Sequence, residues 1–135
     1  NRRGEWSALR NLSGIYLMIN HYENALVYCE KALKIIQELG DRFGESDTLN
    51  VIAGIYARSG QYETAIGYYQ QILSVTRQLG YRFLEGYTRG SISYCYARLK
   101  QHDRAMRNSK LAIKIGREIN NKQLLGAAVG TLANA

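Results

Sequence analysis

Apolar residues recur along this chain at the spacing of helices that bury one face. Between residues 45 and 58 they fall at i, i+3, i+4 and i+7, and they are Leu49, Ile52, Ala53 and Tyr56. Between residues 62 and 79 the same spacing gives Ala65, Ile66, Tyr69, Ile72, Leu73 and Thr76. The short segment 59–61 predicts a turn, so the two helices should run antiparallel and pack face to face.

The pattern returns every 40 residues. Matching positions one period apart are Tyr16, Tyr56 and Tyr96; Ala25, Ala65 and Ala105; Gly40, Gly80 and Asn120. A fixed period of this length is typical of repeat proteins, in which each helical pair buries its apolar stripe against the next pair. We expect one domain over residues 1–135, with repeats at about 4–43, 44–83 and 84–123 and a partial repeat at 124–135. The expected helices are 5–18, 22–38, 45–58, 62–78, 85–98, 102–118 and from 122 onward.

These positions resemble the tetratricopeptide repeat, in which small residues lie where two helices approach closely. The resemblance rests on Leu9, Leu12, Ser13, Tyr16, Ala25, Cys29 and Ala32; on Leu49, Ile52, Ala53, Tyr56, Ala65, Tyr69 and Ile72; and on Arg89, Ile92, Ser93, Tyr96, Ala105, Ser109 and Ala112. It implies an all-α, right-handed superhelix of stacked antiparallel helical hairpins, a tetratricopeptide solenoid of about three and a half repeats. Its 40-residue period is similar to that of Pins-type adaptors and bacterial signalling proteins.

The period exceeds the usual one of about 34 residues because the second helix of each repeat is expected to be longer. Where the family has a terminating proline, this chain has residues that allow a helix to continue, namely Gln37, Arg77 and Arg117. The helix should then end at residues that accept the left-handed conformation, which are Gly40, Gly80 and Asn120. The chain lacks an initial Met and stops within a helical pattern, which favours a fragment of a longer protein.

The resemblance implies that the first helix of each repeat lines a concave groove. The implied groove residues are Arg10, Asn11, Gly14, Asn50, Val51, Gly54, Arg58, Tyr87, Ser91, Tyr94, Arg98, Thr131 and Asn134. These positions avoid the apolar stripes, which independently predicts their exposure. Arg58 and Arg98, with Arg10 in support, are expected to bind carboxylates, while the Asn side chains suit the main chain of an extended segment and the Tyr side chains can anchor an interface.

Sequence motifs for catalysis are absent. The chain has no His-Glu-x-x-His and no glycine-rich phosphate loop, and its two histidines, His21 and His102, fall at predicted turns. Glu5, Glu45 and Asp47 are expected to interact with helix ends, and Cys29 and Cys95 to be buried, reduced thiols. We therefore expect no enzyme activity, no metal and no cofactor, but a protein-interaction module that binds a partner peptide or helix in the concave groove, with acidic or carboxylate-terminated segments among the candidates.

The positive charge lies in the C-terminal part of the chain. Residues 1–76 contain seven Lys and Arg against eight Asp and Glu, whereas residues 77–135 contain eleven against three. A basic stripe steps along one predicted helix at Arg104, Arg107, Lys110, Lys114 and Arg117. This stripe allows an alternative function in binding nucleic acid or an anionic surface, although such stripes usually only solubilise; a structural spacer is the other alternative. No apolar run is long enough to span a bilayer, and a cytoplasmic location is expected.

The last predicted helix, from residue 122, has apolar residues on two neighbouring stripes. They are Leu124, Leu125, Ala128, Val129, Leu132 and Ala135. A helix with two apolar stripes needs two packing partners, and terminal repeats need a polar cap to stay soluble. The sequence therefore predicts end-to-end self-association, most simply a two-fold dimer through this helix.

Overall fold

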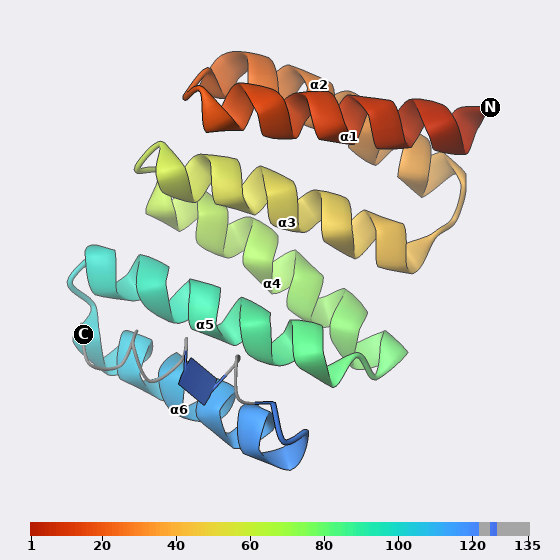
Figure 1. Ribbon diagram of the computed structural model, residues 1–135. Helices are drawn as coiled ribbons and strands as arrows, with labels where there is room; N and C mark the ends of the chain where they lie inside the picture. The colour runs from red at the N-terminus through yellow and green to blue at the C-terminus, as the bar shows by residue number, and fades with distance from the viewer. Residues whose placement is uncertain (122–124, 127–135) are drawn as a thin grey trace. The chain divides into compact units, whose positions relative to one another are not determined.

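The computed structural model describes residues 1–121 and 125–126, and all regular secondary structure in these residues is helical (Figure 1). The six helices are α1 (Arg2–Met18), α2 (Tyr22–Glu38), α3 (Arg42–Arg58), α4 (Tyr62–Leu79), α5 (Arg82–Arg98) and α6 (His102–Glu118). The expected hairpins of α1 with α2 and of α5 with α6 are present. None of the described helices combines the length and apolarity that crossing a bilayer requires.

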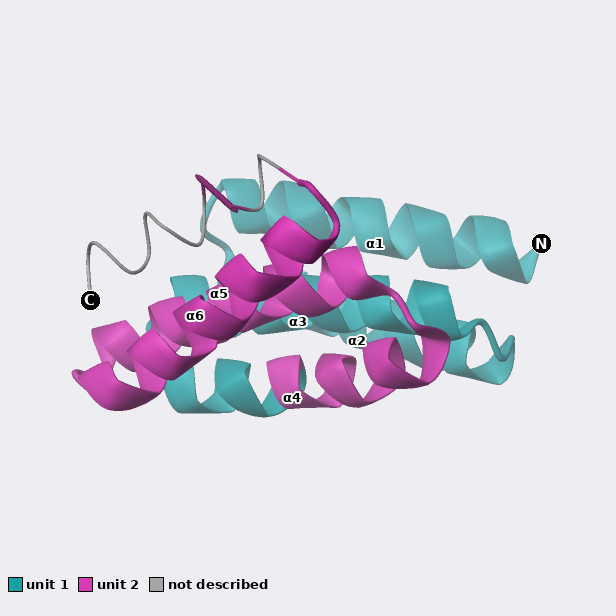
Figure 2. Ribbon diagram, turned by 90° about the horizontal axis from the view of Figure 1, so that it is seen from below, with its two compact units in different colours: residues 1–68 teal, residues 69–135 magenta. Residues whose placement is uncertain are grey.

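Contacts within the chain define two compact units, residues 1–68 and 69–135 (Figure 2). Their boundary falls within α4, so unit 1 holds α1, α2, α3 and the start of α4. Unit 2 holds the end of α4 with α5 and α6. The single domain expected over residues 1–135 stays a prediction.

The core of unit 1 lies where α2 packs against α1 and α3. Its centre consists of the buried side chains Ala25, Cys29, Ile52 and Ile55. Small residues permit the close approach: the buried Ser13 hydroxyl of α1 donates a hydrogen bond to the carbonyl of Ala25 on α2 at 2.7 Å. Because a larger side chain at either position would separate the helices, these residues fix the hairpin.

Unit 2 repeats the same contact between α5 and α6. The buried Ser93 hydroxyl donates to the carbonyl of Ala105 at 2.6 Å, and the Oγ atoms of Ser93 and Ser109 lie 2.5 Å apart. Ser93 and Ala105 lie two periods after Ser13 and Ala25, so the sequence repeat corresponds to a structural repeat.

The starts of the first helices were predicted wrongly. α1, α3 and α5 begin at residues 2, 42 and 82 rather than at 5, 45 and 85. The capping residues explain the first two differences, because the side chain of Asn1 accepts from the Gly4 N–H at 3.1 Å and that of Asp41 accepts from the Gly44 N–H at 3.0 Å. Gly44, which the predicted helix left out, therefore belongs to the first turn of α3.

The residues that follow the second helices and end them were predicted correctly. Gly40, Gly80 and Asn120 adopt φ angles of 70°, 67° and 52°, the left-handed conformation that ends a helix. Each turn between the two helices of a repeat also contains a residue in the left-handed conformation. These residues are Asn20, Gly60 and Lys100, with φ angles of 63°, 84° and 61°. α4 ends at Leu79, one residue later than predicted.

Candidate functional site

A surface pocket of about 500 Å³ lies in unit 1 between α1 and α3. Its lining residues are Arg10, Asn11, Gly14, Ile15, Leu17, Met18, Asn50, Val51 and Gly54. Six of these nine residues were assigned to the groove from the sequence, three from each helix. Their spacing of 40 residues places equivalent positions of α1 and α3 around one hollow.

An ion pair joins the two helices beside this pocket. The Arg10 guanidinium donates a hydrogen bond from Nη2 to Asp47 Oδ1 at 3.0 Å, and its Nε lies within ion-pair distance of Asp47 Oδ2, at 2.5 Å. Arg10 therefore already has a carboxylate partner within the chain, which differs from its expected support of a bound carboxylate. Asp47 lies beyond the first turn of α3 and pairs with Arg10, so its expected role at a helix end is wrong.

Two carboxamides in the pocket are available to a ligand. Among the described residues, the side chains of Asn11 and Asn50 have no hydrogen-bond partner, and Asn11 is exposed while Asn50 is half-buried. A carboxamide offers two N–H donors and one acceptor oxygen. The two side chains can therefore bond both the N–H and the C=O of a peptide main chain.

Two glycines of the pocket, Gly14 and Gly54, lie inside helices at positions where no steric contact requires glycine. A Cβ added to Gly14 or to Gly54 would meet no atom within 4 Å, so neither helix–helix packing nor backbone conformation demands glycine there. Glycine in a helix interior costs about 0.5–1 kcal/mol relative to alanine. Both positions leave the helix backbone accessible within the pocket.

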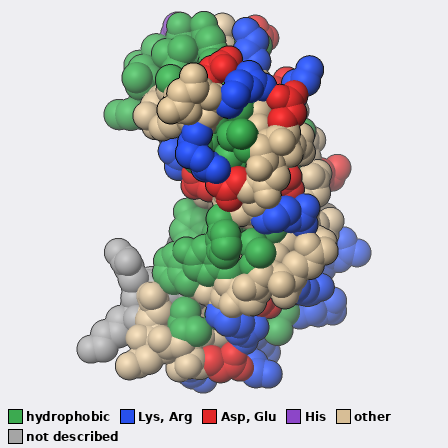
Figure 3. Space-filling view, turned by 90° about the vertical axis from the view of Figure 1, so that its right-hand side faces the viewer, with side chains coloured by type: hydrophobic (Ala, Val, Ile, Leu, Met, Phe, Trp, Pro, Cys, Tyr) green, Lys and Arg blue, Asp and Glu red, His purple; other side chains and the backbone are tan. Residues whose placement is uncertain are grey.

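Three apolar residues of the pocket were missed by the sequence analysis: Ile15, Leu17 and Met18. Ile15 is 56% and Met18 is 77% exposed, whereas Ile55, one period after Ile15, is fully buried. Met18 lies one period before Arg58, which was assigned to the groove. Aligning the repeats could therefore have identified Met18 as a groove residue. Hydrophobic side chains also reach the surface among charged ones on the face drawn in Figure 3.

Arg58 lies at the end of α3 and outside the lining of the pocket. Its side chain is exposed, and Nη2 donates to Asn20 Oδ1 at 3.4 Å, in the turn between α1 and α2. Arg98, its counterpart one period later, belongs to unit 2 and is also exposed. The groove that these two arginines were expected to share stays a prediction.

The predicted groove residues of unit 2 lie along α5. Tyr87 and Tyr94 are 45% and 49% exposed, and Ser91 Oγ donates to the Tyr87 carbonyl at 3.2 Å. Phe83, which the sequence analysis missed, stacks on Tyr87 with 6.5 Å between ring centroids; its spacing of four residues from Tyr87 was the available signal. Thr131, Asn134 and the predicted dimer interface lie outside the described residues.

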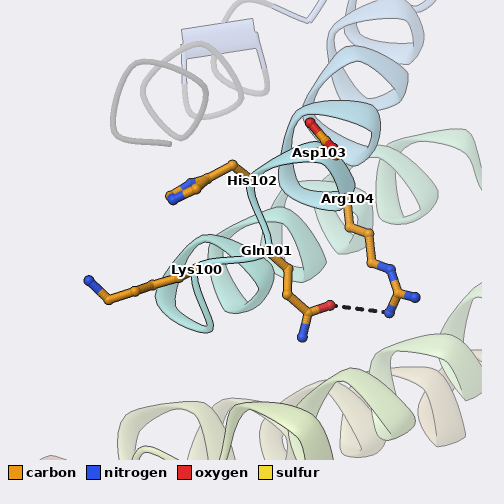
Figure 4. Close-up of a pocket in the computed structure, with 5 residues that line it drawn as sticks. All are labelled: Lys100, Gln101, His102, Asp103 and Arg104. Carbon is orange, nitrogen blue, oxygen red and sulfur yellow. Dashed lines mark hydrogen bonds between the residues drawn. The ribbon is translucent and has the colours of Figure 1, made fainter.

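The starts of α2 and α6 carry smaller concavities. Residues 100–104 line one of about 480 Å³ and residues 20–24 line one of about 370 Å³. His102 points away from the hydrogen bond that Arg104 Nη1 donates to Gln101 Oε1 at 3.2 Å (Figure 4). Because one continuous segment forms each concavity, no groups from different elements converge there as a catalytic site needs.

In the described part of the chain, the two cysteines are not activated as nucleophiles, and no group of residues is arranged to bind a metal ion. Burial raises the pKa of Cys29 and of Cys95 to about 11, so both thiols stay protonated and weakly nucleophilic near neutral pH. Within residues 1–121 and 125–126, no three His, Cys, Asp or Glu side chains are grouped to hold a metal ion.

Solved structures share this fold. The sensor-bearing signal transduction ATPase PH0952 of Pyrococcus horikoshii matches 98% of the chain at 26% identity and a TM-score of 0.91. The apo form of RapI matches 98% at 21% identity and a TM-score of 0.90. A Rap protein complexed with Competence and Sporulation Factor matches 98% at 21% identity and a TM-score of 0.84. The chain spans 37% of each Rap protein and 21% of PH0952.

These likenesses confirm the all-α fold class of a tetratricopeptide solenoid. A comparison with curated proteins gives no match. The family model for the tetratricopeptide repeat matches residues 6–78 and 44–118, which together cover most of the chain and confirm the resemblance seen in the sequence. The chain therefore belongs to the tetratricopeptide repeat family.

Proposed function

We propose that this chain is a non-catalytic interaction module that binds an extended segment of a partner protein in the pocket between α1 and α3. The tetratricopeptide fold is a general protein-interaction module, and a Rap protein of similar fold forms a complex with Competence and Sporulation Factor. The observation that carries the proposal is the pair of unbonded carboxamides, Asn11 and Asn50, in a pocket whose two helical glycines leave the backbone accessible.

The carboxamides favour an extended segment over a helix. Within a helix the main-chain N–H and C=O groups bond one another, so they offer nothing to Asn11 and Asn50. An extended segment leaves both groups available. Gly14 and Gly54 let such a main chain approach α1 and α3 closely, since no Cβ separates it from the helices.

The remaining lining residues determine which side chains fit. Ile15 and Met18 expose apolar surface at one end of the pocket, which favours a large apolar side chain there. Arg58 lies near that end, beside Asn20, and favours a carboxylate, because a charge-assisted hydrogen bond is about twice as strong as a neutral one. The segment that fits combines one apolar residue with one acidic residue.

An array of octapeptides tests this proposal. One Leu and one Asp are placed at every pair of positions in a Ser-Gly background, and the affinity of each hit is measured by fluorescence anisotropy. Asn11→Ala and Asn50→Ala should each weaken binding about 2- to 13-fold, as expected for a lost hydrogen bond of about 0.5–1.5 kcal/mol.

The matched control is Gln37→Ala, which removes an exposed carboxamide from α2 and should leave affinity unchanged. Equal affinities in all three variants and the unmodified chain would contradict binding in the pocket. Absence of any binding peptide would contradict the proposed function itself.

A further inference from the structure

Five cationic side chains extend along the outer side of α6, in unit 2. All five are exposed and follow one another at steps of three or four residues: Arg104, Arg107, Lys110, Lys114 and Arg117. With a rise of about 1.5 Å per residue, the first and the last lie about 20 Å apart along the helix axis. The opposite side of α6 is buried and packs against α5. We call these five residues the basic face of α6.

The equivalent positions of the other second helices show that the fold does not require this charge. One period earlier, the residues of α4 are Thr64, Gly67, Gln70, Ser74 and Arg77; two periods earlier, those of α2 are Asn24, Val27, Glu30, Lys34 and Gln37. All ten are exposed. The formal charge of the five positions is +5 in α6, +1 in α4 and zero in α2. The cations are therefore a property of α6 and not of the repeat.

The charge of the basic face is not neutralised within the described part of the chain. Arg104 Nη1 donates to the neutral Gln101 Oε1 at 3.2 Å. The other four cations form no side-chain hydrogen bond or ion pair with any described residue. Of the two acidic residues of α6, Glu118 pairs with Arg82, and Asp103 lies in the first turn, where a negative charge stabilises the helix end. The basic face thus remains available to an anionic partner.

The arrangement of the five cations around α6 indicates the shape of that partner. Successive residues of a helix are turned by about 100°, so the basic face spans an arc of about 140°, with Arg104 and Arg117 at its two edges. A flat anionic surface contacts only the middle of such an arc. A nucleic-acid groove has phosphates along both walls, and the major groove of B-DNA, about 12 Å wide, admits an α-helix. The arc therefore favours a duplex over a bilayer.

The remaining side chains of α6 favour the same partner. Its exposed large apolar residues are Met106 and Leu111, at 42% and 36% exposure, and they form no continuous apolar face of the kind that inserts into a membrane interface. An interface with a protein also needs an apolar centre that is poor in charged residues. Because α6 contains no aromatic residue, it offers no ring on which the bases of a single strand could stack.

We propose that the basic face of α6 binds the phosphate backbone of a nucleic-acid duplex without reading its base sequence. The arginines can each bond a phosphate through two N–H groups, and the lysines contribute point charges. This activity goes beyond peptide binding in the pocket between α1 and α3. It does not depend on that binding, because the pocket belongs to unit 1 and the basic face to unit 2.

The salt dependence of binding to a fluorescein-labelled DNA duplex of about 20 base pairs tests this proposal. Fluorescence anisotropy gives the association constant between about 50 and 200 mM KCl. Each phosphate contact contributes about −0.9 to the slope of its logarithm against the logarithm of salt concentration, so five contacts predict a slope of about −4.5. Duplexes of different base sequence should bind equally well.

The double variant Lys110→Gln, Lys114→Ser introduces the residues that α4 has at the equivalent positions. It should keep its melting temperature and helical circular dichroism, bind the duplex more weakly and reduce the steepness of the slope by about two. The single variant Arg104→Thr, also the residue of α4, should reduce the steepness by about one.

The matched control is the double variant Lys31→Gln, Lys34→Ser, which removes two exposed lysines from α2 and changes the net charge by the same amount. Its slope should equal that of the unmodified chain. Equal slopes in the two double variants, whether reduced or unchanged, overturn the proposal, and so does a lack of duplex binding at about 50 mM KCl. Tighter binding to phosphatidylserine vesicles or to polyglutamate than to the duplex, if lost in the α6 variant, assigns the basic face to a membrane or an acidic protein and also overturns it.

Discussion

Replacing Gly14 and Gly54 with alanine should stabilise the protein and weaken its proposed peptide binding at the same time. An added Cβ at either position meets no atom within 4 Å, so alanine fits without strain. Each substitution removes the entropic cost of a helical glycine, about 0.5–1 kcal/mol. The double variant should therefore gain about 1–2 kcal/mol in the free energy of unfolding.

The same two methyl groups project into the pocket between α1 and α3. A peptide main chain lying against the helices would be displaced, at a cost of the order of the 1–3 kcal/mol known for overpacking. The affinity of the best octapeptide should fall about tenfold or more. Urea denaturation measures the first effect and fluorescence anisotropy measures the second.

Gly67→Ala is the matched control. Gly67 is an exposed residue within α4, and a Cβ there also meets no atom within 4 Å, but it does not line the pocket. This variant should gain stability equally and bind the peptide with unchanged affinity. If all three substitutions stabilise and none alters affinity, the glycines do not mark a close approach of a ligand, and the reasoning fails.

Three further predictions concern packing, protonation and charge. Gly44→Ala should lower the free energy of unfolding by about 1–3 kcal/mol, because its Cβ would come within 2.7 Å of the buried Ile36 side chain; urea denaturation showing no loss contradicts this packing. Iodoacetamide should modify Cys29 and Cys95 slowly at pH 8 unless urea is added. Because burial raises the pKa of both thiols from 9.0 to about 11, the unfolded state loses these protons first, and stability should decrease as pH rises from 9 to 11. The double variant Arg58→Glu, Arg98→Glu should keep its helical circular dichroism and bind Asp-containing octapeptides at least about tenfold more weakly, whereas equal affinity shows that neither arginine contacts the ligand.

Local patterns in the sequence were sufficient to predict the helices and their ends. The 40-residue period aligned glycine or asparagine at the end of each second helix, and all three adopt the left-handed conformation. The helix starts were predicted less well, because the helix expected at 45–58 left Gly44 outside it. Its place in α3 follows from the Asp41 cap and from the close contact with Ile36, a residue of a different helix.

One feature of the site that the sequence analysis did not predict is a pairing between distant residues. Arg10 and Asp47 are 37 residues apart, and no periodic pattern indicates that they bond each other. The resemblance to the tetratricopeptide repeat assigned six of the residues that line the pocket, and periodicity indicated that these positions lie away from the apolar stripes. Periodicity does not show whether an exposed side chain already has a partner, as Arg10 does.

The most direct test of peptide binding in the pocket is a ¹H–¹⁵N correlation spectrum recorded during titration with the best octapeptide. The backbone amides of Gly14 and Gly54 and the side-chain amides of Asn11 and Asn50 report on the pocket from α1 and α3. Our account predicts that these signals shift together and saturate at one peptide per chain. Shifts confined to α2, α4 or α6, with these four residues unchanged, would contradict it.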